Sequence, residues 1–443
     1  MNTNGALSLL TFVAVALTHG AAAAATFYVD DTGDDTNNGL TPRTAWATLQ
    51  KAVDTIRPGD TIKVLPGVYA GCRIRKSGAP RRPKTLRAEP PWGAVVNAPG
   101  PINRHGSNIE VEDYDDVVVH DWVIDGFELA SAPRSGVDVR VTRDITVQNC
   151  HVHDSGRTGI FTAFSDHVVI QHNESEFNGE HGVYTSNSGD FPVVRGNLLH
   201  HNRSAGVHMN GDRNFTPGDG LISFAEVEGN IIWENGLGGA SAINCDGVSD
   251  SVIRYNVLYE NHASGISLFA IDGSEGSSRN KVYNNTIVMA EGSRWVVNIP
   301  ESPEGISNPR CNTIVNNILY TPRLDRGSIL IYEGGAEDPC FYSDYNVVVD
   351  RFSRDNGETI INLATWRRTT GQDRHSILAA PWALFVDPAS DDYRLRGGSP
   401  AIDRGLFLWD ALPDALEGTP PPIGATYDIG AYEADTSSEH GPR

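Results

Sequence analysis

A short segment recurs seven times in this chain, and this recurrence limits the possible folds more than any other feature. Each copy has an aliphatic residue, two further residues and then an asparagine, which a cysteine replaces in the first copy. The resulting column is Cys150, Asn173, Asn197, Asn230, Asn256, Asn285 and Asn317. In the first five copies a glycine follows nine residues later, at Gly159, Gly182, Gly206, Gly239 and Gly265. A fixed pattern at variable spacing, here 23 to 33 residues, indicates one structural unit per copy, with the extra residues in loops.

The residue types within each copy predict β-strands. An aliphatic residue three positions before the column, such as Val147 or Ile170, is followed by a polar one, such as Gln148 or Gln171, which is the alternation of a strand. About 24 residues hold three short strands and three turns, which is one coil of a parallel β-helix. Leucine-rich repeats have a similar period, but leucine is sparse here. Buried asparagines would satisfy one another by stacking at the ~4.8 Å strand spacing.

The ends of the chain differ from these repeats. Residues 6–25 are apolar and end in small residues, so we predict a signal peptide over 1–25 and a secreted protein, extracellular or periplasmic. An N-terminal strand and a capping helix are expected over 26–60, because apolar residues from Ala45 to Ile56 share one helical face before Pro58. We expect coils over 61–345, most regular over 145–320, then closing coils and a cap over 346–433 and a flexible tail over 434–443.

Two terminal motifs resemble a known family. The opening FYVDDTGDDTNNG, with ATLQKAVDTIRPGDTIKVLPGVY, resembles the amino-terminal segment of secreted polysaccharide lyases, and LRGGSPAIDRG with DIGAYE resembles their closing motif. Over most of residues 27–433 the chain is thus similar to the pectate lyase superfamily. That resemblance implies a right-handed, all-β parallel β-helix and a polysaccharide substrate. The same fold carries lyases, uronan C5-epimerases, glycoside hydrolases and proteins without known catalysis, and neither motif contains catalytic residues.

The formal charge of −21 argues against nucleic acid and anionic membrane surfaces as partners. An anionic glycan would therefore need a local basic patch or a bridging cation. No run after the signal segment is long enough to span a bilayer, and we expect an elongated monomer. The chain has five cysteines, an odd number, so a bridge between Cys311 and Cys340 stays open and no pairing is predicted.

The longest step in the regular stretch, from Asn197 to Asn230, directs attention to the strand GVHMNGD, after which the extra residues leave. Two residues after the column glycines, outward positions are predicted to stack as Phe161, Tyr184, His208, Ser241 and Ser267. Tyr184 and His208 would then be neighbours on successive coils.

A neighbouring tyrosine and histidine suit β-elimination from a uronate or its C5 epimerisation, which need a base at C5 and an acid near O4. We predict His208 as the base and Tyr184 as the acid or a second base. His181 and Arg203 are further catalytic candidates. Substrate-binding candidates within one coil are Arg157, Asn210 and Glu180.

Other chemistries remain open. Turn carboxylates at Asp212, Asp219 and Asp246 predict a possible Ca²⁺ site, with no other cofactor expected. A glycoside hydrolase would use a carboxylate pair drawn from Glu180, Asp190 and Asp212. A surface protein that binds glycans without turnover is a third reading. No zinc site is predicted for His151, His153, His200 and His201, because adjacent strand positions face opposite ways.

Overall fold

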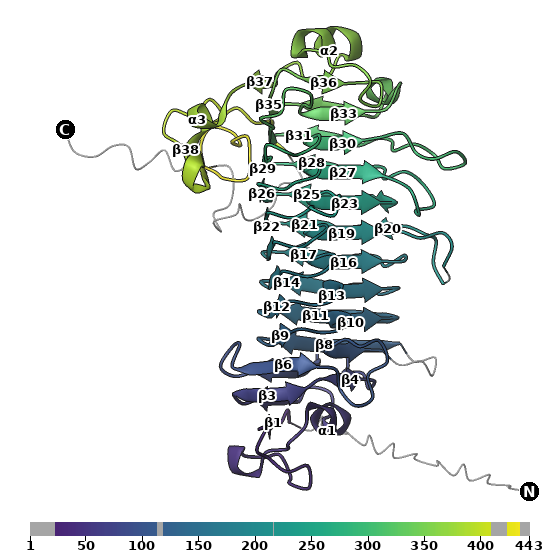
Figure 1. Ribbon diagram of the computed structural model, residues 1–443, viewed down its shortest axis with the longest axis vertical. Coiled ribbons are helices and arrows are strands. Elements are labelled where there is room, and N and C mark those ends of the chain that lie inside the picture. The colour runs from purple at the N-terminus through teal and green to yellow at the C-terminus, as the bar shows by residue number, and fades with distance from the viewer. Residues whose placement is uncertain (1–22, 113–117, 216, 409–422, 435–443) are drawn as a thin grey trace, which may run out of the picture.

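A computed structural model describes residues 23–112, 118–215, 217–408 and 423–434. The chain forms one column of stacked coils, with the N-terminal strands at one end and helix α2 (Leu363–Thr370) at the other (Figure 1). Residues 1–22 of the predicted signal peptide and 435–443 of the predicted tail lie outside the described residues. Among the residues described, no helix is long and apolar enough to cross a membrane.

Three long parallel sheets run along the column, as the repeat predicts. Sheet A consists of β1 (Thr26–Val29), β2 (Thr61–Val64), β5 (Lys84–Ala88), β8 (Val119–Asp125), β11 (Thr142–Gln148), β14 (Val169–Gln171), β17 (Val193–Arg195), β21 (Glu226–Glu228), β25 (Val252–Arg254), β28 (Lys281–Tyr283), β31 (Thr313–Val315) and β34 (Tyr342–Asp344). Sheet B consists of β3 (Gly67–Ala70), β6 (Ala94–Ala98), β9 (Glu128–Ala130), β12 (His151–His153), β15 (Glu174–Glu176), β18 (Leu198–His200), β22 (Ile231–Trp233), β26 (Val257–Tyr259), β29 (Thr286–Val288), β32 (Ile318–Tyr320), β35 (Val347–Val348) and β37 (Ile377–Leu378).

Sheet C faces the viewer in Figure 1. It consists of β4 (Cys72–Ile74), β7 (Ile109–Val111), β10 (Ser135–Arg140), β13 (Thr158–Ala163), β16 (Val183–Ser186), β19 (Val207–Asn210), β23 (Ile243–Asp246), β27 (Ile266–Phe269), β30 (Val297–Ile299), β33 (Ile329–Ile331) and β36 (Phe352–Ser353). Short pairs lie outside the column strands: β20 (Ile222–Ser223) with β24 (Val248–Ser249), and β38 (Phe385–Asp387) with β39 (Asp392–Leu395).

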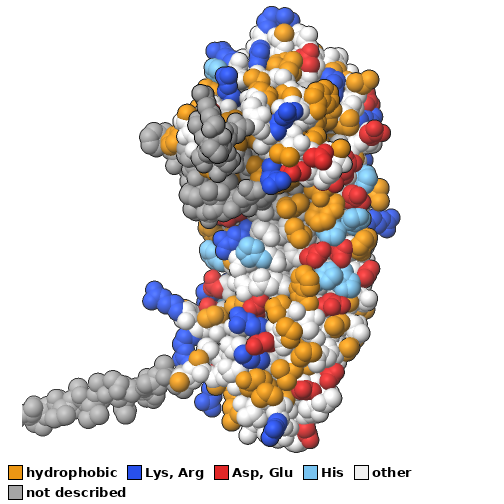
Figure 2. All heavy atoms as spheres, turned by 90° about the vertical axis from the view of Figure 1, so that its left-hand side faces the viewer, with side chains coloured by type: hydrophobic (Ala, Val, Ile, Leu, Met, Phe, Trp, Pro, Cys, Tyr) orange, Lys and Arg blue, Asp and Glu red, His pale blue; other side chains and the backbone are white. Residues whose placement is uncertain are grey.

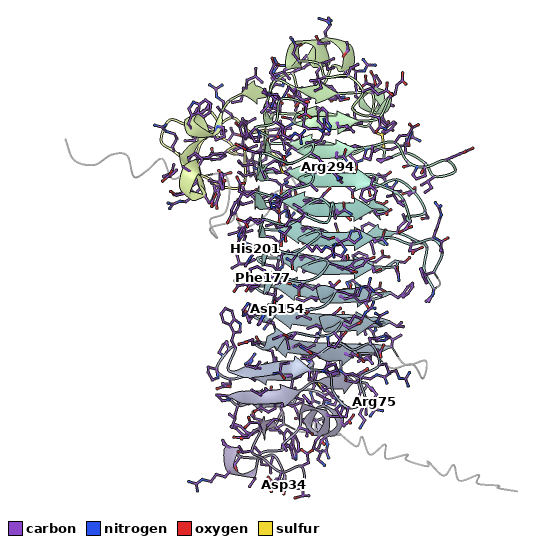
Figure 3. All side chains as sticks on the ribbon, in the orientation of Figure 1. Asp34, Arg75, Asp154, Phe177, His201 and Arg294 are labelled. Atoms are coloured by element: carbon purple, nitrogen blue, oxygen red, sulfur yellow. A yellow bond between two sulfur atoms is a disulfide. The ribbon has the colours of Figure 1, made fainter. Side chains whose placement is uncertain are left out.

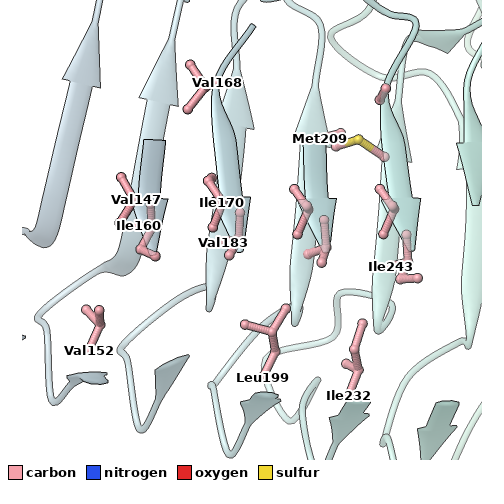
Figure 4. Close-up of a cluster of buried hydrophobic side chains, with 14 of the residues drawn as sticks. Val147, Val152, Ile160, Val168, Ile170, Val183, Leu199, Met209, Ile232 and Ile243 are labelled. Atoms are coloured by element: carbon pink, nitrogen blue, oxygen red, sulfur yellow. The ribbon is translucent and has the colours of Figure 1, made fainter. Parts of the chain in front are cut away.

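Aliphatic side chains from all three sheets fill the interior of the column (Figure 4). One coil contributes Val147 from β11, Val152 from β12 and Ile160 from β13, and each is fully buried. Their equivalents on the next coils stack above them in register, such as Ile170 on Val147 and Val183 on Ile160. Each coil thus buries its apolar residues only against its neighbours, which is the packing of a solenoid.

The asparagine column forms a continuous buried ladder, as predicted. Strand register aligns all seven positions, and Asn346 adds a further rung. The Asn256 side chain donates to Asn285 Oδ1 at 2.9 Å, and its own Oδ1 accepts from the Asn230 side chain at 2.9 Å and the Asn230 backbone N–H at 3.0 Å. Because the amide of one coil satisfies the next, a polar residue is stable inside the column.

Two features of the turns accompany this ladder. The residue just before each rung has positive φ, for example 56° at His172 and 52° at Tyr255. This left-handed conformation makes the sharp bend from sheet A to sheet B, and the ladder stabilises it against its steric cost. A second buried ladder, which we did not predict, follows five residues after the first: Asn178, Asn202, Asn235 and Asn261.

One prediction about the glycine column is wrong. Val207 aligns with Ile243, so the residue equivalent to Gly206 is Ala242 and not Gly239. The outward neighbour of His208 is therefore Asn244, in place of the predicted Ser241. The insertion around Gly239 shifted the apparent spacing by three residues, and spacing alone could not reveal this shift.

A helix forms where the apolar face predicted it. Helix α1 (Leu49–Thr55) buries Leu49, Ala52 and Val53 in the main core. Gln50 donates to the Arg73 carbonyl oxygen at 3.0 Å and accepts from its N–H at 2.8 Å, so the side chain pairs with the outer edge of β4. The contact satisfies edge groups that would otherwise invite pairing with another chain. A capping role for this helix stays a prediction.

The C-terminal segment lies along the side of the column as well as beyond its last coil (Figure 1). Helix α2 stacks Trp366 on Phe352 of β36 at a 5.0 Å ring distance. Helix α3 (Pro381–Leu384), β38 and β39 pack with residues 427–431 on the outer side of sheet B, where they cover Val257, Val288 and Ile318. These residues bury an outward apolar face of sheet B that the coils themselves do not cover.

Cys311 and Cys340 form a disulfide across 29 residues, a pairing that the sequence left open. Cys72, Cys150 and Cys245 are free and buried. Replacing Cys311 with serine should lower the free energy of unfolding by about 3 to 4 kcal/mol, since the bridge restricts the unfolded chain. Urea denaturation of the wild type and the variant, each with and without reductant, measures this free energy. If reductant lowered the stability of the variant as much as that of the wild type, the prediction would be contradicted.

Candidate functional site

A cluster of aromatic and imidazole side chains lies on the outward face of sheet C. Strand register stacks Phe161, Tyr184, His208 and Asn244 on successive coils, which confirms the predicted adjacency of Tyr184 and His208. The rings of Tyr184 and His208 are 4.5 Å apart between centroids. His181, from the turn before β16, lies 4.5 Å from the His208 ring and 5.1 Å from the Tyr184 ring. The three rings form the His181–Tyr184–His208 cluster.

Burial keeps the two histidines of this cluster neutral. It lowers the pKa of His208 to about 4, and burial together with the nearby His208 and Arg157 lowers the pKa of His181 to about 2. Burial raises the pKa of Tyr184. At neutral pH the cluster therefore offers two neutral imidazoles and a protonated phenol, the states needed for a general base and a general acid.

Hydrogen bonds orient these groups. His208 Nδ1 lies 3.2 Å from the Asn244 carbonyl oxygen and 3.0 Å from the Asn244 side-chain nitrogen. When Nδ1 donates to the carbonyl, Nε2 carries the free lone pair. His181 Nδ1 accepts from the Ala205 N–H at 3.2 Å, and Asn210 donates to the Tyr184 hydroxyl at 3.3 Å.

The structure brings most of the other candidates to the same place. Arg157 pairs with Glu180 at 2.9 Å beside the cluster; Arg157 helps to lower the pKa of His181, and Glu180 acts to raise the pKa of His208 against the effect of burial. Asn210 bonds Tyr184, as described. Arg203 is exposed, and the hydrogen bonds found for it in the described residues involve only its backbone, so the structure gives its guanidinium no contact with the cluster.

Next to the cluster, on the following coils of sheet C, lies an open cleft of about 640 Å³. Asn244 lines it and also bonds His208, so the cleft and the cluster are continuous. Its lining residues include Arg294, Arg326, which also pairs with Asp325 at 3.2 Å, amides such as Asn298, and Phe269. No aspartate or glutamate is among the described residues that line it, although the chain has a formal charge of −21.

Arg294 stands out among the lining residues. It is exposed and projects from the connection before β30 (Figure 3), and its guanidinium donates to the Gly239 carbonyl oxygen at 3.3 Å. In the described part of the chain it has no carboxylate partner, so its charge is available to an anionic ligand. We did not predict Arg294, Arg326 or Asn244. Arg294 lies in the long step from Asn285 to Asn317, which was a sequence signal for a loop at this position.

The acidic calcium candidates do not come together. Asp246 accepts backbone N–H bonds from Ile271 at 2.8 Å and Gly273 at 3.1 Å, and Asp212 accepts from Asn214 at 2.8 Å. Asp219 accepts from Leu221 at 2.9 Å. Over the described residues, these three carboxylates do not form a group of ligand atoms within 4.8 Å of one another. Asp212 and Asp219 each accept from their own turns and Asp246 accepts from the turn of the next coil, and no metal is assigned to them.

The carboxylates suggested for glycoside hydrolysis also have local partners. Glu180 is held by Arg157, and Asp190 accepts the Ser223 N–H at 3.0 Å. Burial raises the pKa of Asp190. No contact links Glu180, Asp190 and Asp212 as an acid and base pair among the described residues, so this reading gains no support.

Comparison with known proteins agrees with this architecture. Residues 102–239 match a family model described as a right handed beta helix region. The fold is a right-handed parallel β-helix. Solved β-helix structures similar to this chain include the pectate lyase Pel9A, with a TM-score of 0.61 and 16% identity over 94% of this chain and 97% of that chain.

Two further β-helix structures are similar. A rhamnogalacturonan lyase has a TM-score of 0.53 and 15% identity, covering 67% of this chain and 83% of that chain. XylC, solved in complex with xylose, has a TM-score of 0.52 and 10% identity, covering 80% of this chain and 82% of that chain. No curated protein matches the sequence. At these identities the likeness shows the fold alone, and activity must be argued from the site.

Proposed function

We propose that this protein is a polysaccharide lyase that cleaves a uronate-containing glycan by β-elimination. The observation that carries the proposal is the neutral His181–Tyr184–His208 cluster, continuous with a cleft that has arginines and no carboxylate among its described lining residues. In a protein of charge −21, such a cleft favours an anionic chain over a neutral one. Two proteins of similar fold, Pel9A and a rhamnogalacturonan lyase, are named as lyases, which agrees with this reading.

The proposed reaction uses two of the three rings, those of His208 and Tyr184. His208 Nε2 removes the C5 proton, the C5 electron pair forms the C4–C5 double bond, and the bond from C4 to O4 breaks. Tyr184 gives its proton to the departing O4. Arg157 beside the cluster would neutralise the uronate carboxylate, because the C5 proton is weakly acidic until that charge is balanced.

One geometric fact favours elimination over C5 epimerisation. Tyr184 and His208 project from the outward face of sheet C, and the ring of His181, from the turn before β16, lies against both, so all three would reach a bound sugar from the same side. Removal of the C5 proton and protonation of O4 from one side suit elimination from a sugar whose C5 proton and O4 lie on the same face of the ring. Epimerisation needs a proton donor on the opposite face of the ring, and the cluster provides none there.

We also propose that the protein is secreted. The apolar segment over residues 6–25 has the pattern of a signal peptide. The disulfide between Cys311 and Cys340 agrees with an oxidising compartment outside the cytosol.

Ultraviolet absorbance during incubation with pectate, alginate, glucuronan and glycosaminoglycans tests the lyase proposal, since elimination creates an absorbing double bond. A rise with one polymer, with calcium or with chelator, is the expected result. New saturated reducing ends without absorbance would indicate hydrolysis instead. Solvent deuterium at C5 without cleavage would indicate epimerisation, and binding without any product would indicate a glycan-binding protein.

Replacing Arg294 with glutamine should raise KM roughly tenfold with little change in kcat, because a charged hydrogen bond to substrate is lost away from the reacting carbon. Steady-state kinetics on the active polymer measures both constants. The matched control is Arg374→Gln, since Arg374 is also exposed and bonds a backbone carbonyl, that of Gly371 at 3.1 Å, outside the cleft. Equal KM values for the two variants would remove Arg294 from the binding site.

A further inference from the structure

The outward face of sheet B carries histidine and glutamate side chains that alternate from coil to coil. Register places Glu174 beside His151, Glu176 beside His153, and His200 beside Glu176. Histidine and acidic side chains gather on the face of the column seen in Figure 2. This face belongs to a different sheet from the proposed active site, and the lyase chemistry does not use it.

Three of these side chains converge. His151 Nε2 lies 2.8 Å from Glu176 Oε1, and ligand atoms of His151, Glu174 and Glu176 all lie within 4.8 Å of one another. His200 on the next coil lies beside both carboxylates: its Nε2 is 3.2 Å from Glu174 Oε1, and its Nδ1 is 3.5 Å from Glu176 Oε2 and 2.9 Å from His201 Nδ1. All four side chains are half-buried or buried.

The sequence predicted no zinc site for His151, His153, His200 and His201, from the directions of adjacent residues along the chain. His201 follows β18 in the turn, and its Nδ1 lies 2.9 Å from Nδ1 of His200. The converging ligands come instead from successive coils, where parallel register stacks side chains at about 4.8 Å. That register was not visible in the spacing of histidines alone.

We propose that His151, Glu174 and Glu176 bind a divalent transition metal ion, with His200 as a positioning residue for the two carboxylates. An imidazole nitrogen with carboxylate oxygens suits Zn²⁺ and excludes a preference for Ca²⁺, which takes oxygen ligands. Zinc ligands at about 2.0 to 2.2 Å lie roughly 3 to 4 Å from one another. Side-chain rotation alone therefore closes these atoms around an ion.

A second group of ligand types, Cys311, Asp338 and Cys340, offers no competing site. Both sulfur atoms belong to the disulfide, so neither is a thiolate. The histidine and glutamate group is the one remaining set of three or more converging ligand types in the parts of the chain that the structure covers. A metal there would join β12 to β15 and stabilise the stacking of two coils.

The test uses the full chain after removal of metals with a chelator. Equilibrium dialysis against micromolar Zn²⁺, with metal content measured by mass spectrometry, should give one zinc per chain. Thermal unfolding should shift upward by a few degrees on zinc addition and not on Ca²⁺ addition. Glu176→Gln, which keeps the size of the side chain, should weaken zinc binding at least tenfold, as should His151→Ala.

His375→Ala is the matched control, because His375 pairs with Asp344 at 2.7 Å on another part of the surface without a third ligand. It should bind zinc as the wild type does. Equal zinc affinity in wild type and Glu176→Gln, or no zinc bound by the wild type, would overturn the proposal. Circular dichroism checks that each variant keeps the folded column. If His151→Ala is misfolded, the zinc affinity of Glu176→Gln decides the test.

Discussion

Replacing His208 with alanine is expected to lower kcat about a thousandfold while KM changes little. The variant removes the base that takes the C5 proton, and positioned general bases contribute roughly 10²- to 10⁴-fold. The cleft next to the cluster, with Arg294 and Arg326, remains intact and still binds the polymer. Initial rates of absorbance change measure kcat, and the same titration measures KM.

The wild-type pH profile gives an independent check on this base. A base must be neutral to accept a proton, and burial lowers the pKa of His208 to about 4. The value of kcat/KM should therefore be constant on the acidic side of neutrality and fall as the pH drops through about 4. If kcat/KM instead fell as the pH dropped through about 6.5, the ordinary pKa of histidine, the base would be another group.

His375→Ala is the control for the His208 substitution, because His375 lies far along the chain and is half exposed beside Asp344. It should keep full activity. Tyr184→Phe should lose activity comparably to His208→Ala, since it removes only the hydroxyl that Asn210 contacts. A His208→Ala variant with normal turnover would reduce the cluster to a surface feature and favour a different site.

Replacing Asn256 with alanine should lower the free energy of unfolding by about 3 to 5 kcal/mol. The side chain is fully buried and makes four ladder contacts, with Asn230, Asn285 and the Val227 carbonyl. Its loss leaves several buried polar groups without partners, each worth roughly 1 to 3 kcal/mol. Chemical denaturation followed by circular dichroism measures the effect.

The control for the ladder is Asn214→Ala. Asn214 is exposed, and its side chain donates only to Asp212, at 3.1 Å, so its loss should cost less than about 0.5 kcal/mol. Because coils stack one on another, the ladder variant should also broaden the unfolding transition. Similar stability in the two variants would mean that water replaces the ladder contacts, and the ladder would then not stabilise the interior.

Much of the column was predictable because its signals are local and periodic. The asparagine column and the aliphatic residues three positions before it predicted the coils and their register. Together with the glycines nine residues after the column, that register predicted the adjacency of Tyr184 and His208, which the structure confirms. The second ladder, at Asn178, Asn202, Asn235 and Asn261, is equally periodic and was predictable in the same way, although we did not predict it.

The parts that depend on inserted residues were not predictable in the same way. Gly239 matched the spacing of the glycine column, yet the insertion before it moved the true equivalent to Ala242 and the outward residue to Asn244. The cleft arose from loops of several coils, which bring Gly239, Arg294 and Asn356 together. Contacts between loops depend on how each loop packs, and no periodicity records this.

The sequence by itself determined the β-helix, its inward aliphatic residues and its main asparagine ladder, because these repeat at fixed offsets and each coil needs only its neighbours. Tertiary structure alone decided which outward side chains converge, as in the arginine-lined cleft and the group of His151, Glu174 and Glu176. It also decided the Cys311–Cys340 pairing. The physical reason is that convergence depends on side-chain directions and loop paths across coils, which spacing along the chain does not specify.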